Sequence, residues 1–201
     1  MSEGTMARIL AFSDMHGSRR CAAEIVAAAG DADLVIGAGD FCVMRQGLAD
    51  AMALLAPIGA KAVYVPGNAE SAGELRAATG ATVLHGAGAE RAGLRVFGLG
   101  YGVPTTPFGA WSCDLSEAEA EALLAGMEEA DILVSHAPPE GVADRTSAGV
   151  SVGSSAVRAA IERVQPVLCL CGHIHDSWGQ WGRIGRTLVH NLGPRPNRFE
   201  V

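Results

Sequence analysis

The chain has 201 residues, a length typical of one domain with its own core. Hydrophobic residues make up 49% of it and charged residues 18%, which excludes a disordered tail and a disulfide-stapled miniprotein. The formal net charge of -7 argues against broad binding to a nucleic-acid backbone, and no apolar run reaches the ~20 residues of a membrane span.

The chain start, Met1–Thr5, lacks the basic patch and apolar stretch of a signal peptide. We predict a disordered start or leader over these five residues. A single domain is expected over residues 6–201. The five cysteines are an odd number without framework spacing, and two of them lie in the apolar run Val167–Cys171. We therefore expect reduced thiols in a soluble, cytoplasmic protein. Its oligomeric state is left open.

Short apolar runs alternate with longer amphipathic ones along the chain, which is the pattern of an α/β fold. The first part is predicted to be a βαβαβ unit. Its elements are a strand over Arg8–Phe12, a helix over Arg20–Ala29, a strand over Leu34–Ile36, a helix over Gly47–Leu55 and a strand over Ala62–Val65.

The middle of the chain predicts some antiparallel sheet. A short helix over Ser71–Ala78 is followed by three apolar runs that are separated only by Gly-bearing turns. Such turns predict hairpins between the strands. The three expected strands are Thr82–His85, Ala89–Arg91 and Leu94–Leu99.

The last part predicts two helices, two strands and a closing hairpin. Ser116 and Glu119 form a capping box that opens a helix running to about Glu129. The remaining elements are a strand over Ile132–Ser135, a helix over Ser154–Arg163, a strand over Val167–Cys171, and a hairpin of Trp178–Ile184 with Arg186–His190. Two long Gly-rich loops, Gly100–Cys113 and Pro138–Gly153, are left between elements, and loops of that length in a compact domain are usually functional.

Polar side chains follow most of the predicted strands. They are Asp14 and His16, Asp40, Asn68, His136, and His173 with His175. Because the carboxyl ends of parallel strands converge on one crevice, these seven side chains should face each other. Two carboxylates, four imidazoles and one amide suit divalent Mn, Fe, Zn or Ni. Seven ligands are too many for one tetrahedral ion, but they divide between two ions if one carboxylate bridges.

A two-metal site suits phosphoryl chemistry. With ions ~3.5–4 Å apart, a shared water loses a proton near neutral pH and becomes the nucleophile, while both ions neutralise the phosphate oxygens. No serine or cysteine nucleophile is then required. A mononuclear zinc hydrolase would need only three protein ligands and would leave the other candidates unexplained.

Five motifs together resemble the calcineurin-like metallophosphoesterase superfamily over nearly the whole chain, from Ile9 to Asn191. The motifs are Asp14-Met15-His16, Gly39-Asp40, Gly67-Asn68, Ser135-His136 and Gly172-His173-Ile174-His175. The resemblance implies a four-layer α/β/β/α sandwich of two mixed sheets flanked by helices, with a dinuclear centre at the strand ends. The short chain is similar to the small prokaryotic phosphodiesterases of the family.

By position, the resemblance implies a role for each of the seven residues. Asp14, His16 and His175 would hold the first metal, Asn68, His136 and His173 the second, and Asp40 would bridge them. The catalytic residues would be Asp40, Asn68 and His136, the latter two ordering the second metal and the substrate oxygens. The cofactor is expected to be two divalent ions, with manganese favoured and Fe, Zn or Ni as alternatives.

The chain departs from the family pattern near two ligands. It reads Gly67-Asn68-Ala69-Glu70, where the family usually has histidine in place of Ala69. That imidazole would protonate the leaving oxygen, and general-acid assistance is typically worth ~10²–10⁴-fold. We therefore expect slow turnover, or a preference for good leaving groups, unless another donor substitutes. Val43 stands where phosphatases usually carry a second aspartate, and Arg45 lies one position beyond a phosphate-binding arginine.

Other polar and aromatic residues have a plain structural interpretation beside a functional one. Asp14 and Asp40 could also cap helices, and Asn68 could form a turn. His85, His190 and Cys42 are expected to be structural. Arg145 and the Ser147–Ser155 segment have about even odds of contacting phosphate or forming a solvated loop. Tyr101, Phe108 and Trp111 either stack on a substrate ring or close the core, which is the preferred interpretation.

These observations predict a metal-dependent phosphoesterase that acts on a phosphodiester through a metal-bridging hydroxide. One alternative is a phosphomonoesterase or protein phosphatase, and another is a non-catalytic metal-binding scaffold of the same fold. The substrate is expected to be a small phosphoester, with a nucleotide-like molecule as one candidate.

Overall fold

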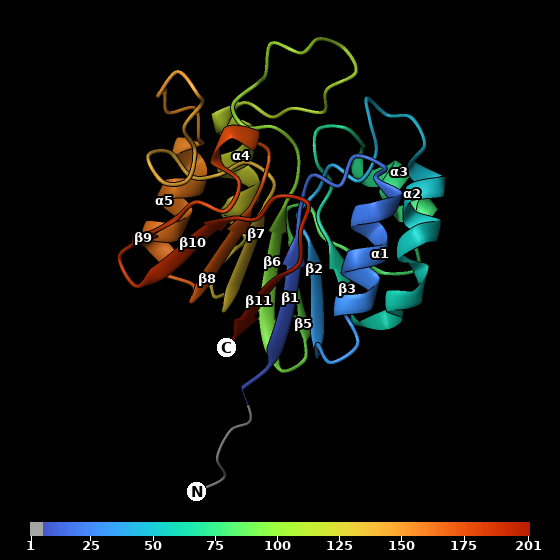
Figure 1. Ribbon diagram of the computed structural model, residues 1–201. Helices are drawn as coiled ribbons and strands as arrows, with labels where there is room; N and C mark the ends of the chain where they lie inside the picture. The colour runs from blue at the N-terminus through green and yellow to red at the C-terminus, as the bar shows by residue number, and fades with distance from the viewer. Residues whose placement is uncertain (1–5) are drawn as a thin grey trace, which may run out of the picture.

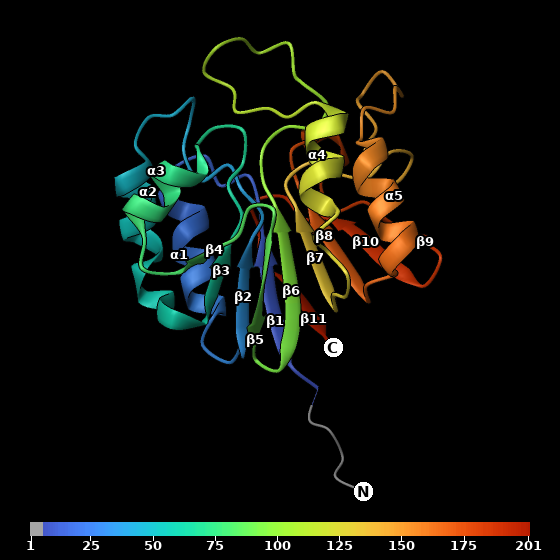
Figure 2. The same ribbon diagram turned by 180° about the vertical axis from the view of Figure 1, so that it is seen from behind.

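The computed structural model describes residues 6–201, so the predicted leader Met1–Thr5 lies outside the described residues. Two sheets pack face to face and helices cover both outer faces, which confirms the predicted four-layer sandwich (Figure 1). One outer layer holds α1 (Arg19–Ala28), α2 (Leu48–Leu55), the 3-10 helix η1 (Ala56–Lys61) and α3 (Ala72–Ala78). The other holds α4 (Glu117–Leu124) and α5 (Ser155–Val164), as the view from behind also shows (Figure 2).

The first sheet is parallel except at one edge. Its strands are β1 (Arg8–Phe12), β2 (Leu34–Gly37), β3 (Ala62–Tyr64), β4 (Thr82–Val83) and β11 (Asn197–Glu200), in the order β11-β1-β2-β3-β4. Only β11 runs antiparallel to its neighbour β1. The carboxyl ends of β1, β2 and β3 therefore lie at one edge of this sheet.

The second sheet has four parallel central strands and an antiparallel strand at each edge. Its strands are β5 (Ala87–Arg91), β6 (Leu94–Leu99), β7 (Ile132–Ser135), β8 (Leu168–Cys171), β9 (Trp181–Ile184) and β10 (Thr187–Asn191), in the order β5-β6-β7-β8-β10-β9. The parallel strands are β6, β7, β8 and β10. A short 3-10 helix, η2 (His175–Ser177), follows β8.

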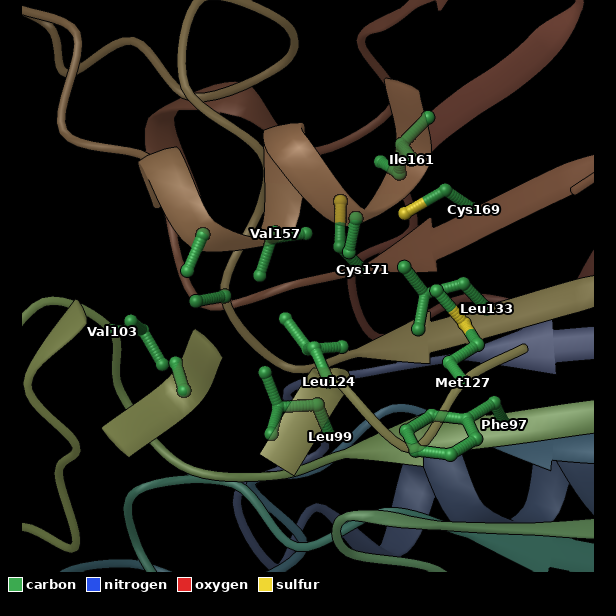
Figure 3. Packing of buried hydrophobic residues seen from close by; sticks show 14 of the residues in the cluster. Phe97, Leu99, Val103, Leu124, Met127, Leu133, Val157, Ile161, Cys169 and Cys171 are labelled. Carbon is green, nitrogen blue, oxygen red and sulfur yellow. The ribbon is translucent and has the colours of Figure 1, made fainter. Parts of the chain in front are cut away.

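Three apolar clusters hold the layers together, because the central strands are buried on both faces. In β1, Ile9 points between the sheets while Leu10 packs under the helices α1 to α3. This period-2 alternation is what a strand between two cores requires. The third cluster lies beneath α4 and α5 and includes Phe97, Met127 and Ile161 (Figure 3). No helix of the described chain exceeds ten residues, too few to cross a bilayer.

Two sequence-based expectations about elements were wrong, and one strand was not predicted. The helix opened by Ser116 ends at Leu124 rather than near Glu129, because the chain turns at Gly126 and inserts Met127 into the core. The expected strand over Thr82–His85 is only β4, which pairs with β3 in the first sheet instead of forming a hairpin with β5. The edge strand β11 was not predicted, since its short sequence has no apolar run.

Candidate metal centre

The seven predicted ligands follow strand ends from both sheets, and the structure brings them together at one edge. They are Asp14, His16, Asp40, Asn68, His136, His173 and His175. Backbone hydrogen bonds join the loops after β1 and β2: the Asp14 N–H donates to the Gly39 carbonyl and the His16 N–H to the Asp40 carbonyl, each at 2.9 Å. The loop positions are therefore fixed by the main chain as well as by side chains.

One group consists of Asp14, His16 and His175. Their ligand atoms all lie within 4.8 Å of one another. The Nε2 atoms of His16 and His175 are 3.2 Å apart, and Nε2 of His175 is 3.7 Å from an Asp14 oxygen. Convergence of two imidazole nitrogens and a carboxylate on one point provides a donor set that a divalent cation can use.

Asp40 lies between this group and a second one. Its Oδ2 is 3.6 Å from Nε2 of His16, whereas its Oδ1 is 3.4 Å from Nε2 of His136. Nε2 of His136 in turn lies 3.1 Å from the Asn68 amide oxygen, and the His136 ring centroid is 4.9 Å from that of His173, with the two rings tilted by 57°. Each oxygen of Asp40 therefore faces a different set of donors.

The histidine tautomers are set by backbone carbonyls. Nδ1 of His16 is 3.0 Å from the Cys42 oxygen, and Nδ1 of His136 is 2.7 Å from the Ala38 oxygen. Because a carbonyl oxygen can only accept, both Nδ1 atoms carry the proton. In the neutral form of each imidazole the lone pair is then on Nε2, the nitrogen that faces the other candidate ligands.

Burial and neighbouring charges act in opposite directions on the histidines. Burial, with nearby His136, holds the pKa of His173 well below its ordinary value. Burial also acts to lower the pKa of His136, but the carboxylates of Asp40 and Asp14 outweigh it and raise that pKa. The two carboxylates therefore act most strongly on His136, whereas His173 is governed by burial and by the neighbouring histidines.

The backbone at four of the seven residues is in the left-handed region. The φ angles are 54° at Asp14, 46° at His16, 56° at Asp40 and 67° at His173. Non-glycine residues rarely adopt this conformation, and such strain is found where the surrounding structure fixes a functional group. The clustering of left-handed residues therefore marks the site through backbone conformation, without reference to the chemistry of the side chains.

Two glycines allow the loops to approach each other closely. A Cβ on Gly67 would lie 2.0 Å from Oδ1 of Asp40, and a Cβ on Gly172 would lie 2.4 Å from Oδ2 of Asp14. Both contacts are far shorter than van der Waals distance. The glycines that precede Asn68 and His173 are therefore required for the two aspartates to occupy their positions.

Glu70 is a site residue that sequence reasoning did not assign. Its fully buried carboxylate accepts the backbone N–H groups of Asp40 at 2.8 Å, Gly67 at 2.7 Å and Phe41 at 3.1 Å. Burial and the nearby Asp40 charge raise the pKa of Glu70, while the backbone N–H groups that it accepts act to lower it. Glu70 thus holds the loop after β2 against the loop after β3. The sequence signal that could have identified Glu70 was its position at the end of the Gly67–Glu70 motif.

Trp178 is a second missed residue. Its indole Nε1 donates to Oδ2 of Asp14 at 3.0 Å, and its ring lies 4.3 Å from the His175 ring. The Ser13 hydroxyl donates to the same carboxylate oxygen at 2.6 Å. Two side-chain donors thus fix Oδ2, and the His173 backbone N–H donates to Oδ1 at 3.1 Å and to Oδ2 at 3.2 Å. Oδ1 also faces Nε2 of His175. A tryptophan after the His173–His175 motif gave no sequence signal for this contact.

Replacing Trp178 by phenylalanine is expected to weaken metal affinity about 10- to 100-fold, the usual cost of losing a hydrogen bond to a ligand. Phenylalanine keeps an aromatic ring beside His175 but removes the indole N–H. Isothermal titration of the metal-free protein with Mn²⁺ measures the effect. Trp181→Phe is the matched control, since Trp181 is 66% exposed on β9 and should bind metal unchanged. Equal affinities in both variants would contradict the assignment.

Several secondary candidates are structural, as expected. His85 stacks at 4.3 Å on Tyr101, and His190 packs on Phe199. Cys42 is buried, and its thiol donates to the Ala69 carbonyl at 3.1 Å. Arg45 cannot act as a free phosphate clamp, because its guanidinium bonds Glu74 at 2.7 Å and the Cys113 sulfur at 3.0 Å.

The two long loops differ in their relation to the site. In the segment from 138 to 153, the Arg145 guanidinium donates to the Gly149 carbonyl within its own loop, and neither Arg145 nor residues 147–155 line the site pocket. Residues 100–113 supply Phe108 and Trp111 to that pocket. The expectation that these two rings close the core was wrong, since Phe108 is 50% exposed and neither ring belongs to an apolar cluster.

The site is a pocket of about 270 Å³. Two of its lining residues come from the long loop after β6, which rises above the sheets (Figure 1). Its lining residues are His16, Asp40, Asn68, Phe108, Trp111, His173 and His175. Among the described residues, the lining thus contains five of the candidate ligands and two aromatic rings, with no arginine or lysine.

Solved structures of known proteins share this fold at low sequence identity. The protein TT1561 of Thermus thermophilus is 18% identical with a TM-score of 0.76, over 98% of this chain and 99% of that one. A dimetal phosphatase from Danio rerio is 14% identical with a TM-score of 0.64, over 94% and 88%. An archaeal phosphodiesterase is 12% identical with a TM-score of 0.54, over 96% and 99%.

These structures establish the fold alone, and no match was found among curated protein sequences. A sequence model described as calcineurin-like phosphoesterase matches residues 7–177, which include all seven candidate ligands and most of the chain. The chain therefore belongs to the calcineurin-like phosphoesterase family.

Proposed function

We propose that this protein is a metal-dependent hydrolase that cleaves a small phosphodiester at a dinuclear centre. The observation that carries the proposal is the position of Asp40, whose two oxygens face His16 at 3.6 Å and His136 at 3.4 Å. A carboxylate placed in this way can be shared between two ions. The family in general hydrolyses phosphoric esters, which agrees with this assignment.

The donor set of two carboxylates, four imidazoles and one amide suits two divalent ions such as manganese, iron, zinc or nickel, and manganese is the ion that we propose to test first. Asp14, His16 and His175 would hold one ion, Asn68, His136 and His173 the other, and Asp40 would contact both. Two such ions lower the pKa of water and neutralise the charge of a bound phosphate.

The chain's own residues orient the reaction partners. Nε2 of His136 and the Asn68 amide oxygen lie 3.1 Å apart and face the same side of the pocket as Asp40. The Asn68 amide nitrogen donates to the Ser112 hydroxyl at 3.0 Å, which fixes the amide's orientation. We assign catalytic roles to Asp40, Asn68 and His136 as groups that would hold the ions and order the substrate oxygens. Asp40 and Asn68 line the pocket, and the buried His136 contacts both of them.

A diester fits the pocket better than a monoester. A phosphomonoester carries about two negative charges near neutral pH, whereas a diester carries one. The pocket lining of the described chain offers no arginine or lysine to balance the second charge. Ala69 also presents no proton donor for the leaving oxygen, and it is buried beneath the site. Esters with good leaving groups should therefore react fastest.

The test is metal content by mass spectrometry combined with hydrolysis of bis-p-nitrophenyl phosphate and p-nitrophenyl phosphate after manganese loading. We expect two ions per chain and a kcat/KM that is about tenfold or more higher for the diester. The reverse preference would support the phosphomonoesterase alternative. Two ions without turnover of either ester would support the scaffold alternative, and a chain that binds no metal would refute the dinuclear centre.

A further inference from the structure

Two aromatic rings, Phe108 and Trp111, form one side of the candidate site. They lie parallel, at an interplanar angle of 9° with ring centroids 5.7 Å apart. The Phe108 ring also meets the His173 ring edge-on at 6.4 Å. Phe108 is half exposed, and it lies beside Trp111 in the pocket lining, so the apolar surface here is formed by two adjacent rings and not by one isolated residue. We call these two residues the aromatic pair.

The loop that carries the aromatic pair is held in place at both sides of the rings. Asp114 accepts the Thr106 N–H at 3.0 Å and the Ser112 hydroxyl at 2.9 Å. The Cys113 N–H donates to the Asn68 carbonyl at 2.9 Å. The loop is therefore bound directly to a residue of the candidate metal centre. Rings held in this way lose little conformational entropy when a ligand binds.

We propose that the aromatic pair selects phosphoesters that carry a planar ring, with a nucleobase as the ring. This inference rests on the proposed function, since it names the substrate class of the same site. The phosphate would occupy the polar part of the pocket, beside His16 and Asp40, and the base would stack on the exposed face of the pair. Aromatic side chains stack on any base, because every base has a π-face.

The competing occupant is an ester of a sugar or of glycerol, which has no planar ring. Such a ligand could pack only C–H groups against the aromatic pair and would gain less from it than a planar base does. The pair has no charge, so it contributes no attraction to phosphate. Its presence therefore adds most affinity for a planar ring on the ligand.

The test compares ligands that share the phosphate and differ in the ring. Isothermal titration of the manganese-loaded full chain is run with AMP against ribose 5-phosphate, and with phenyl phosphate against methyl phosphate. We expect AMP to bind about 5- to 150-fold more tightly than ribose 5-phosphate, the range for stacking of one base. Phe108→Ala and Trp111→Ala should each reduce AMP affinity and leave ribose 5-phosphate affinity unchanged. Trp181→Ala, on an exposed residue outside the pocket lining, should change neither.

Each outcome decides between the possibilities. Equal binding of AMP and ribose 5-phosphate, or equal losses of both in the variants, would overturn the proposal. A preference for phenyl phosphate over methyl phosphate, without a preference for AMP over ribose 5-phosphate, would overturn the assignment of the ring as a nucleobase. It would identify an aryl ester as the substrate class instead. Hydrolysis of bis-p-nitrophenyl phosphate is measured separately. If hydrolysis of this ester persists while the ring preference is absent, a substrate-selecting role of the aromatic pair is excluded and the phosphoesterase proposal stands.

Discussion

Asp40→Asn is expected to reduce kcat/KM for bis-p-nitrophenyl phosphate by at least about 10³-fold, because metal-ion catalysis supplies several kcal/mol of transition-state stabilisation. Asparagine retains the shape of the side chain and the oxygen that accepts the Ala69 N–H at 2.8 Å. It loses the negative charge and the second oxygen ligand, which faces His16 at 3.6 Å. Metal content should fall from two ions per chain to one or none.

The fold should survive this substitution, so activity and folding can be separated. The buried Asp40 carboxylate lies close to the buried Glu70 carboxylate, and removing one of two like charges relieves repulsion. We expect the free energy of unfolding of the metal-free protein to change by less than about 1 kcal/mol. Asp50→Asn, on the exposed face of α2, is the matched control and should retain full activity. An Asp40→Asn enzyme within about tenfold of the parent would contradict the bridging position.

The candidate ligands could be predicted because a strong topological rule applies to them. Asp14, Asp40 and Asn68 each follow a parallel strand, and the carboxyl ends of such strands meet. The rule depends on which residues follow which strands along the chain, and it can be applied without knowing how the side chains pack. The structure places all seven residues together, and the role of each as a ligand stays a prediction.

The supporting residues could not be predicted in the same way. Trp178 acts through one N–H that reaches Asp14, a residue 164 positions earlier in the chain. Glu70 acts through backbone groups, which leave no pattern of residue types in the sequence. Phe108 and Trp111 were misassigned, because an apolar residue in a loop packs into a core more often than into a site. Tertiary contacts decide all of these positions.

The elements of the fold also divide into those that the sequence predicts and those that depend on tertiary contacts. Strands buried on both faces, such as β7 with four fully buried residues, have apolar runs that identify them. The edge strand β11 alternates half-buried and exposed residues, and it exists because β1 offers an unpaired edge. Short edge strands depend on a partner that the local sequence does not encode.

Glu70→Ala is expected to destabilise the metal-free protein by about 3–5 kcal/mol, the usual cost of removing a buried charged hydrogen-bond acceptor. Four buried backbone N–H groups lose their acceptor, those of Asp40, Phe41, Cys42 and Gly67. Alanine also leaves a cavity between the loops after β2 and β3. Urea denaturation followed by circular dichroism measures the loss, and metal affinity should fall with it because Asp40 is no longer held.

Glu70→Gln separates the contribution of the charge from that of the hydrogen bonds. The glutamine oxygen can still accept from Asp40 and Gly67, while its amide nitrogen opposes the Phe41 N–H. We therefore expect a smaller loss, about 1–3 kcal/mol. Glu24→Ala is the control, since Glu24 only pairs with Arg20 on the exposed side of α1 and should cost less than about 0.5 kcal/mol. If Glu70→Ala were as mild as this control, Glu70 would not position Asp40, and the main-chain bonds between the loops would have to do so alone.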